Sequence, residues 1–317
     1  MASEAFNYHI TFPAPLVPGD KIAIVSPASA VKEEYVEGAI KKIVEKGYEV
    51  VLLPHVLNHA SGSFSATKSE RLLDLLDALE DESIKAIFCA RGGYGCCQLL
   101  PHLPQKLISK NPKWIIGFSD ISALLAAWYD AGVASIHGPM AKYLSTHPAD
   151  DPCSESLFRI LENGGGFSYK FPSAPGNRDG RVSGRLVGGN LAVLNDLSNT
   201  SYDMLEKEEE EVILFLEDIS EPIYAVERML MRLYLSSSLK RIKGFVFGQF
   251  TEYKPDRNHA TMEEMLRQFV NMPALKDLPI AFEFPIGHAE INYPLVVGAK
   301  VDLEISSGNV IISTIDS

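Results

Sequence analysis

The sequence is poor in cysteine and tryptophan, and it lacks any long apolar run. Its 317 residues include four cysteines and two tryptophans. Cys89, Cys96, Cys97 and Cys153 form no CxxC pair and match no zinc-ligand spacing, and adjacent cysteines are poorly placed for a disulfide. We therefore expect free thiols, buried or half-buried, and no metal site. No window of about 18 uninterrupted apolar residues occurs, so no membrane span is expected.

Positive charge is also scarce. The chain has 29 Lys and Arg against 41 Asp and Glu, which gives a formal charge of −12. Such a surface repels phosphate backbones, and no basic cluster reverses it locally, so nucleic acid is not an expected partner. The N-terminus has neither the basic nor the apolar region of a signal peptide, and we expect a cytoplasmic protein.

What the first half does contain is an alternation of strand and helix patterns. Apolar runs occur at 21–27, 48–54, 84–90, 113–118 and 133–139. Such runs, separated by helical patterns, are typical of a parallel sheet covered on both faces. The sequence thus predicts an N-terminal doubly wound, mainly parallel α/β domain over residues 1–160. In the helical pattern of 67–81, we expect a buried face formed by Leu72, Leu73, Leu76 and Leu79.

The second half has a different composition at its start. Residues 161–182 are dense in Gly, Pro, Ser and Asn, which predicts a linker. Strand and helix patterns return after it, with a strong strand at 211–218, and several short strands close the chain. Residues 183–317 are therefore predicted to form a C-terminal α/β domain with a β-rich end.

Two loops of the first half are candidates for chemistry, because ligands bind beyond the carboxyl ends of strands in open parallel sheets. One is Arg91-Gly-Gly-Tyr-Gly95. It does not fit a dinucleotide-phosphate motif, because Gln98 stands where the last glycine belongs, but bare glycine N–H groups can also approach an oxyanion. A tight turn is the alternative use of the same glycines.

The other loop, Gly117-Phe-Ser119-Asp, joins a buried strand to a helical pattern. It resembles a nucleophile elbow, although Ile121 occupies the position of the final glycine. Serine is equally a preferred helix N-cap, so the residues alone leave both roles for Ser119 open.

A nucleophilic serine needs a base and an orienting acid. Glu217 and Asp218 end the strong strand of the second half, and His288 lies in a Gly-flanked loop after another strand. His137, which also follows a first-half strand, is the rival base. The residues by themselves do not decide between the two histidines.

Five motifs, in order, resemble the LD-carboxypeptidases (muramoyltetrapeptide carboxypeptidases), a serine peptidase family that includes the microcin C immunity peptidases. They are ARGGYG, GFSD, GRLVGGNL, LEDISEPIYAVERML and FPIGHAEIN, and the resemblance covers nearly the whole chain. It implies Ser119 as nucleophile, Glu217 as orienting acid and His288 as general base. The backbone N–H groups of Gly93 and Asp120 would form the oxyanion hole.

The same resemblance implies a substrate and leaves His137 a structural or pocket role. The substrate would be a small peptide, the muropeptide tetrapeptide, cut at its L,D-peptide bond to release terminal D-Ala in peptidoglycan recycling, with no cofactor and no metal. Such enzymes often dimerise, so a homodimer is a further expectation. A free carboxylate needs a cation or N–H donors, for which Arg91 and Arg228 are the candidates, with Arg91 favoured.

Two alternatives accompany this hypothesis. A microcin-immunity-like peptidase would cut acyl-adenylate-type conjugates and would need an aromatic side chain to stack on adenine, whereas Trp114 and Trp128 lie in or beside predicted core elements. A non-catalytic binding protein with two α/β lobes would also present a glycine-rich cleft.

Overall fold

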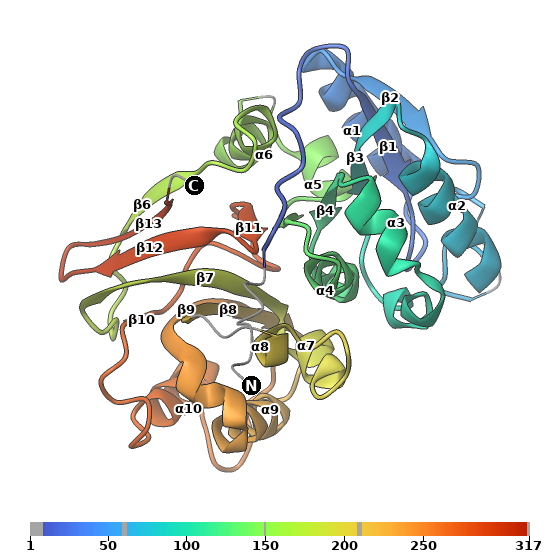
Figure 1. The fold of residues 1–317 in the computed structure, drawn as a ribbon. Coiled ribbons are helices and arrows are strands. Elements are labelled where there is room, and N and C mark those ends of the chain that lie inside the picture. The colour runs from blue at the N-terminus through green and yellow to red at the C-terminus, as the bar shows by residue number, and fades with distance from the viewer. Residues whose placement is uncertain (1–8, 59–61, 149, 208–210, 316–317) are drawn as a thin grey trace, which may run out of the picture.

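Two β-sheets organise the fold, one built mainly by the first half of the chain and one by the second (Figure 1). The structure, a computed structural model, describes residues 9–58, 62–148, 150–207 and 211–315. Residues 1–8, on which the signal-peptide prediction partly rests, lie outside these ranges. No helix in the described ranges has the length and apolar character that a bilayer crossing needs.

The first sheet has six strands in the order β11-β5-β4-β3-β1-β2. Its members are β1 (Lys21–Val25), β2 (Glu49–Leu52), β3 (Ile84–Cys89), β4 (Trp114–Gly117), β5 (Ser135–His137) and β11 (Leu295–Val297). All neighbouring pairs are parallel except β11 with β5. The strands are apolar because helices cover the sheet: α1 (Glu33–Glu45), α2 (Lys68–Glu80), α3 (Gln105–Lys110), α4 (Ser122–Asp130), α5 (Ala141–Thr146) and α6 (Pro152–Glu162).

The second sheet has seven strands in the order β10-β9-β8-β7-β12-β13-β6. They are β6 (Ser168–Pro172), β7 (Gly180–Asn190), β8 (Val212–Ile219), β9 (Ile242–Thr251), β10 (Ile280–Ala281), β12 (Lys300–Ile305) and β13 (Asn309–Thr314). The β7-β8-β9-β10 part is parallel and the β7-β12-β13-β6 part antiparallel. Its helices are α7 (Leu191–Leu197), α8 (Met204–Lys207), α9 (Ile223–Leu235) and α10 (Met262–Val270).

The predicted fold class is confirmed: an α/β chain with a mainly parallel first sheet and a second sheet that is β-rich at its end. The domain boundaries stay a prediction. β6 lies inside the stretch 161–182 and pairs with β13, while β11, from the stretch 183–317, pairs with β5.

The predicted buried face of α2 is wrong in part. Leu79 is buried, but Leu73 is 48% exposed, and the inward positions include Arg71 and Asp74. Both polar side chains have partners on neighbouring loops, since Arg71 donates to Pro27 O and Asp74 accepts from the His55 N–H. Because these hydrogen bonds satisfy Arg71 and Asp74, the buried face of α2 contains two polar side chains, and Leu73 lies outside it.

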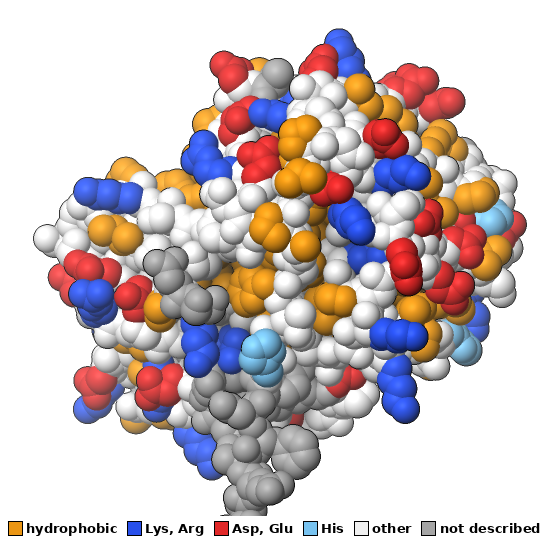
Figure 2. All heavy atoms as spheres, turned by 45° about the horizontal axis from the view of Figure 1, so that its top comes forward, with side chains coloured by type: hydrophobic (Ala, Val, Ile, Leu, Met, Phe, Trp, Pro, Cys, Tyr) orange, Lys and Arg blue, Asp and Glu red, His pale blue; other side chains and the backbone are white. Residues whose placement is uncertain are grey.

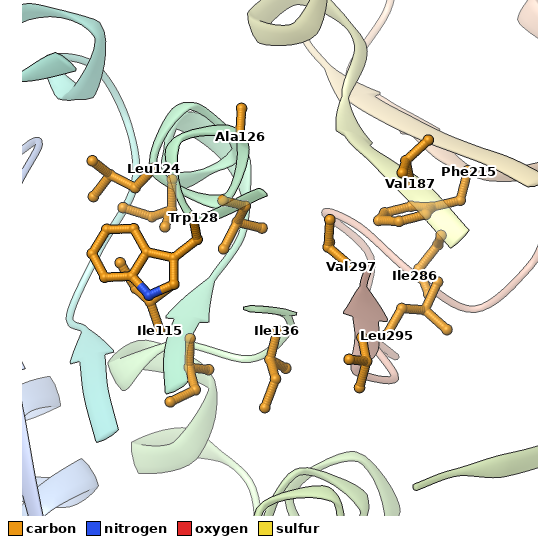
Figure 3. Close-up of a cluster of buried hydrophobic side chains, with 14 of the residues drawn as sticks. Ile115, Leu124, Ala126, Trp128, Ile136, Val187, Phe215, Ile286, Leu295 and Val297 are labelled. Atoms are coloured by element: carbon orange, nitrogen blue, oxygen red, sulfur yellow. The ribbon is translucent and has the colours of Figure 1, made fainter. Parts of the chain in front are cut away.

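The hydrophobic core continues from one sheet to the other through β11. Figure 3 shows Ile115 and Ile136 of the first sheet on one side of β11, and Phe215 and Ile286 of the second half on the other. Leu295 of β11 is fully buried among them. On the face shown in Figure 2, acidic and basic side chains are interspersed.

Candidate active site

Ser119 stands at the turn between β4 and the helix that follows it. It is the first residue of a short 3-10 turn, η3 (Ser119–Ile121), and its φ of 64° lies in the left-handed region, which is strained for serine. Neither η3 nor α4 has a side-chain N-cap, so the capping role for Ser119 is wrong. Its half-buried hydroxyl makes no hydrogen bond to a described residue. The turn therefore presents a free serine hydroxyl at a strand end, as a nucleophile elbow does.

The glycine loop lies directly beside Ser119. A Cβ atom at Gly92 would lie 2.9 Å from Ser119 Cβ, so only glycine permits this approach. Ser29, in the loop after β1, holds the glycine loop from behind: its N–H donates to Gly92 O at 3.1 Å, and its Oγ accepts the Tyr94 N–H at 3.2 Å. The glycines thus serve both a turn and a close approach to the serine.

Asp120 ties the two loops together. Its buried carboxylate accepts the Cys96 N–H at 2.8 Å, which anchors the end of the glycine loop to the turn that carries Ser119. The Gly93 N–H donates to no described residue, and the Asp120 N–H lies in the first turn of a helix, where N–H groups have no intrahelical partner. Asp120 follows Ser119 directly, and Gly93 follows Gly92, the residue that approaches Ser119, so the two loops together offer two unused N–H donors.

Glu217 and His288 form a hydrogen-bonded pair. Glu217 is fully buried on β8, and its Oε2 lies 2.6 Å from His288 Nδ1. A carboxylate only accepts, so Nδ1–H donates and the other ring nitrogen of neutral His288 keeps its lone pair. The His288 ring contacts Phe118, the residue before Ser119, with ring centroids 4.8 Å apart. The Glu217–His288 pair of the second half thus lies against the serine turn of the first.

The loop that carries His288 is fitted closely to Glu217. Gly287 has a φ of 104°, and a Cβ there would lie 2.8 Å from Glu217 Oε2. The Gly287 N–H donates to Oδ1 of the buried Asn292 at 2.9 Å, which closes the loop on itself. Asn292 therefore helps to set where the imidazole points.

His137 approaches the other oxygen of the same carboxylate. Its Nε2 lies 3.6 Å from Glu217 Oε1, which is longer than a hydrogen bond, and its side chain is fully buried. His288 is 14% exposed. Both candidate histidines thus meet at Glu217, but only His288 combines a hydrogen bond to the acid with access to solvent.

The charge of Glu217 is set by these neighbours. Burial by itself raises the pKa of Glu217, but His137 and His288 outweigh burial and hold the pKa at about 2. Next on the strand, burial raises the pKa of Asp218 to about 6 against the N–H donors that it accepts. Glu217 is therefore ionised at neutral pH and can orient a histidine.

The two arginines predicted to bind a carboxylate lie in different places. Arg91 is exposed in the glycine loop and donates from Nη1 to Ala30 O at 2.5 Å. Arg228 lies on α9 with its guanidinium over the Tyr224 ring, and it lines a cavity of about 560 Å³ between α7, α8 and α9. Ser119, Glu217 and His288 are not among the residues that line this cavity. Only Arg91 shares a loop with the candidate site.

The cysteines do not contribute to the site. All four are free, and burial raises the pKa of the Cys96 thiol well above its ordinary value. No group of three or more His, Cys, Asp or Glu side chains within the described ranges is arranged to hold a metal ion.

Sequence patterns do not indicate the roles of Ser29, Asn292 or the carboxylate of Asp120. Each makes its contact through a backbone N–H of a loop whose path is set by tertiary structure. Their positions are the only indication, because each residue follows or lies within a loop at the end of a predicted strand.

The chain matches both domains of one protein family. The LD-carboxypeptidase N-terminal domain matches residues 22–138, and the LD-carboxypeptidase C-terminal domain matches residues 183–303. A murein tetrapeptide carboxypeptidase of Pseudomonas aeruginosa is 31% identical over 294 residues, which cover 90% of this chain and 93% of the relative.

Solved structures show the same fold. The crystal structure of muramoyltetrapeptide carboxypeptidase from Oxalobacter formigenes has a TM-score of 0.82 at 30% identity, covering 93% of this chain and 99% of that one. The microcin C7 self-immunity protein MccF of Escherichia coli is 24% identical in sequence over 96% of both chains. A structure of MccF with aspartyl sulfamoyl adenosine has a TM-score of 0.83 at 24% identity and covers 96% of this chain and 99% of that one, a likeness of fold alone.

Proposed function

The chain belongs to the LD-carboxypeptidase family and is a serine-type carboxypeptidase, and we propose that it releases terminal D-Ala from muropeptide tetrapeptides by hydrolysing an L,D-peptide bond. The substrate class comes from the names of the relatives at 30% and 31% identity, both of which are tetrapeptide carboxypeptidases. A role in peptidoglycan recycling, a cytoplasmic location and a homodimer belong to the same proposal.

The observation that carries the mechanism is the Glu217–His288 contact of 2.6 Å beside a strained, unbonded serine. In the proposed reaction His288 takes the proton of Ser119 as the hydroxyl attacks the peptide carbonyl. Glu217 fixes the imidazole tautomer and stabilises the imidazolium. His288 then gives the proton to the leaving amine, and water hydrolyses the acyl-enzyme by the same steps.

The oxyanion would be bound by the backbone N–H groups of Gly93 and Asp120. Asp120 follows Ser119 in the chain, Gly93 follows the Gly92 that approaches it, and neither N–H is used by the described part of the chain. Such a donor typically contributes about 3–4 kcal/mol to the stability of the transition state. We assign the terminal carboxylate to Arg91, whose guanidinium is exposed on the same loop.

A peptide–nucleotide conjugate is the second candidate substrate, and we rank it lower. The chain is 24% identical to MccF, and both tryptophans are fully buried, so neither is available to stack on a purine. The experiment below therefore includes a peptide–adenylate conjugate as an alternative substrate.

The test is product analysis by mass spectrometry. The enzyme is incubated with the disaccharide-free tetrapeptide, its C-terminal amide, and a peptide–adenylate conjugate. We expect D-Ala from the free tetrapeptide, with rates lower by orders of magnitude in Ser119→Ala, His288→Ala and Glu217→Ala at unchanged circular dichroism. Ser109→Ala, an exposed serine of α3, is the matched control and should cleave as the wild type does.

Three results would overturn the proposal. Cleavage of the conjugate alone would exclude the tetrapeptide as substrate. An active Ser119→Ala variant would exclude the serine mechanism. Normal rates in His288→Ala together with an inactive His137→Ala would transfer the base to the other histidine.

A further inference from the structure

One oxygen of Glu217 is left without a hydrogen bond by the pair with His288. Oε1 is fully buried and has no hydrogen-bond partner within the described ranges. The nearest ionisable atom recorded against it is His137 Nε2 at 3.6 Å, and that nitrogen also lacks a partner there. Two buried polar atoms therefore face each other just outside hydrogen-bond distance.

His137 has little freedom to turn elsewhere. Its side chain is fully buried, and its ring lies edge-on to Phe118 and Phe215, at centroid distances of 5.7 Å and 5.2 Å. Its backbone lies on β5, paired with Gly117 of β4 and Leu295 of β11. Leu295, which is His137's partner across β5 and β11, is one of the apolar side chains in Figure 3. Neither ring nitrogen of His137 has a hydrogen-bond partner within the described ranges, and Nε2 lies 3.6 Å from Glu217 Oε1.

The chemistry of the two groups decides which one donates. An ionised carboxylate only accepts, whereas neutral imidazole carries a proton on one of its two nitrogens. A buried donor or acceptor without a partner is costly, and a proton on Nε2 satisfies both Nε2 and Oε1 at once after a shift of a few tenths of an ångström.

We propose that His137 is a positioning residue that donates its Nε2–H to Glu217 Oε1, so that the carboxylate is held between two imidazoles. This inference rests on the proposed roles of Glu217 and His288 and adds a residue to them. His288 receives its orientation from Oε2, and His137 fixes the opposite oxygen.

The position of His137 on β5 explains why its contact with Glu217 matters for the site. Ser119 comes from the first sheet, whereas Glu217 comes from the second and His288 from a loop of the second half. His137 pairs in register with Gly117, two residues before the serine. The His137–Glu217 contact therefore ties the acid–base pair to the strands that carry the nucleophile.

Kinetics provide the first test, with a matched pair of variants. His137→Gln keeps an N–H donor near the place of Nε2, whereas His137→Leu fills the site without a polar atom. We expect His137→Leu to lower kcat/KM about 10- to 100-fold, mainly through kcat, as loss of a hydrogen bond to a charged group does. His137→Gln should restore most of this loss. Equal activities of the two variants would overturn the proposal.

The pH profile separates positioning from mere packing. The ionisable groups around Glu217 are His137, His288 and Asp218. Without the donor at Oε1 the carboxylate is less stable, so the Glu217–His288 pair binds a proton more tightly. The acid limb of kcat/KM should therefore move to higher pH in His137→Leu and stay in place in His137→Gln. Phe215→Leu, which alters packing at the same point, should leave the limb unmoved, and an unmoved limb in His137→Leu would contradict the inference.

A second measurement needs no activity. In wild-type enzyme labelled with ¹⁵N-histidine, long-range ¹H–¹⁵N spectra assign the tautomer of His137, with His137→Gln identifying its signals. We expect a proton on Nε2, and a neutral ring protonated on Nδ1 alone would overturn the proposal. Activity that survives in Ser119→Ala or His288→Ala would instead overturn the proposed function, so the two failures are distinguishable.

Discussion

Arg91 is the residue to which the proposed function assigns the terminal carboxylate of the substrate. A buried or half-buried carboxylate requires a cation or several N–H donors, and Arg91 is exposed on the loop that approaches Ser119. One of its guanidinium nitrogens already donates to Ala30 O, which leaves the others for a ligand. The side chain therefore has both a fixed orientation and unused donors.

Replacing Arg91 by Met should raise KM for the free-acid tetrapeptide much more than KM for its C-terminal amide, because only the acid carries the charge. Steady-state kinetics on both substrates measure the difference. Arg228→Met is the matched control and should change neither KM, since Arg228 stacks on Tyr224 at a separate cavity. An equal rise in KM for both substrates would show that the substitution had only removed the hydrogen bond to Ala30 O and disturbed the loop.

Glu217 and Asp218 are neighbours on β8 whose ionisation affects folding in opposite directions. The pKa of Glu217 is about 2, below its ordinary 4.5, so its stabilising effect is present above pH 4.5 and is lost as pH falls through 2. The pKa of Asp218 is about 6, above its ordinary 3.8. The stabilising effect of protonated Asp218 on the folded state is therefore fully present below pH 3.8 and is lost as pH rises through 6.

The Asp218→Asn variant isolates the second of these effects. We expect the difference in unfolding free energy between the variant and the wild type to grow in the variant's favour between pH 4 and pH 7, by roughly 2 kcal/mol. Urea unfolding at a series of pH values measures it, and subtraction removes the contribution of Glu217. A difference that is constant over this range would show that Asp218 titrates normally.

At the scale of elements, α2 shows which features of a helix a hydrophobic pattern predicts and which it does not. The pattern locates the helix, which begins after a capping box between Thr67 and Glu70 and ends before Asp81. It does not locate the buried face, because two inward positions belong to Arg71 and Asp74. Their burial depends on partners distant in sequence, which hydropathy does not register.

The same distinction applies to the candidate site. Strand ends and short motifs locate Ser119, Glu217 and His288, because the polar side chains of an α/β site gather where buried strands stop. They do not locate Ser29 or Asn292, whose contacts go to loop N–H groups. Side chains that would react leave a local pattern in the sequence, whereas side chains that hold loops depend on the completed fold.

Arg71 is therefore predicted to matter more to stability than its leucine neighbour. It donates to Pro27 O and Gly95 O, and it stacks on Phe64, while Leu73 is 48% exposed. Arg71→Met should lower the free energy of unfolding by about 2–3 kcal/mol because buried carbonyls lose a charged donor. Leu73→Ala should change it by about 0.5 kcal/mol or less. Chemical denaturation of both variants measures this, and similar losses would contradict the assignment.

At the scale of the whole molecule, β11 joins two sheets that the chain builds from different halves. It lies late in the sequence but pairs antiparallel with β5. Its side chains fill the space between the first sheet and residues such as Phe215 and Ile286 (Figure 3). Separate domains often unfold separately, but elements that share a core lose their packing together. The contact between Phe118 of the serine turn and His288 depends on this junction.

We therefore expect the two halves to unfold in one transition, and the tryptophans provide the test. Trp114 and Trp128 both belong to the first sheet and its helices, so their fluorescence reports on that half, whereas far-ultraviolet circular dichroism reports on both. The two denaturation curves should coincide. Leu295→Ala, a change in β11, removes a fully buried side chain and should lower the free energy of unfolding by about 2–5 kcal/mol. Both curves should shift by the same amount, because the lost packing belongs equally to β5 and to the second half. A dichroism curve that shifts while the fluorescence curve stays in place would show that the first sheet holds its structure without β11. The serine turn would then be connected to Glu217 and His288 only by contacts at the site itself.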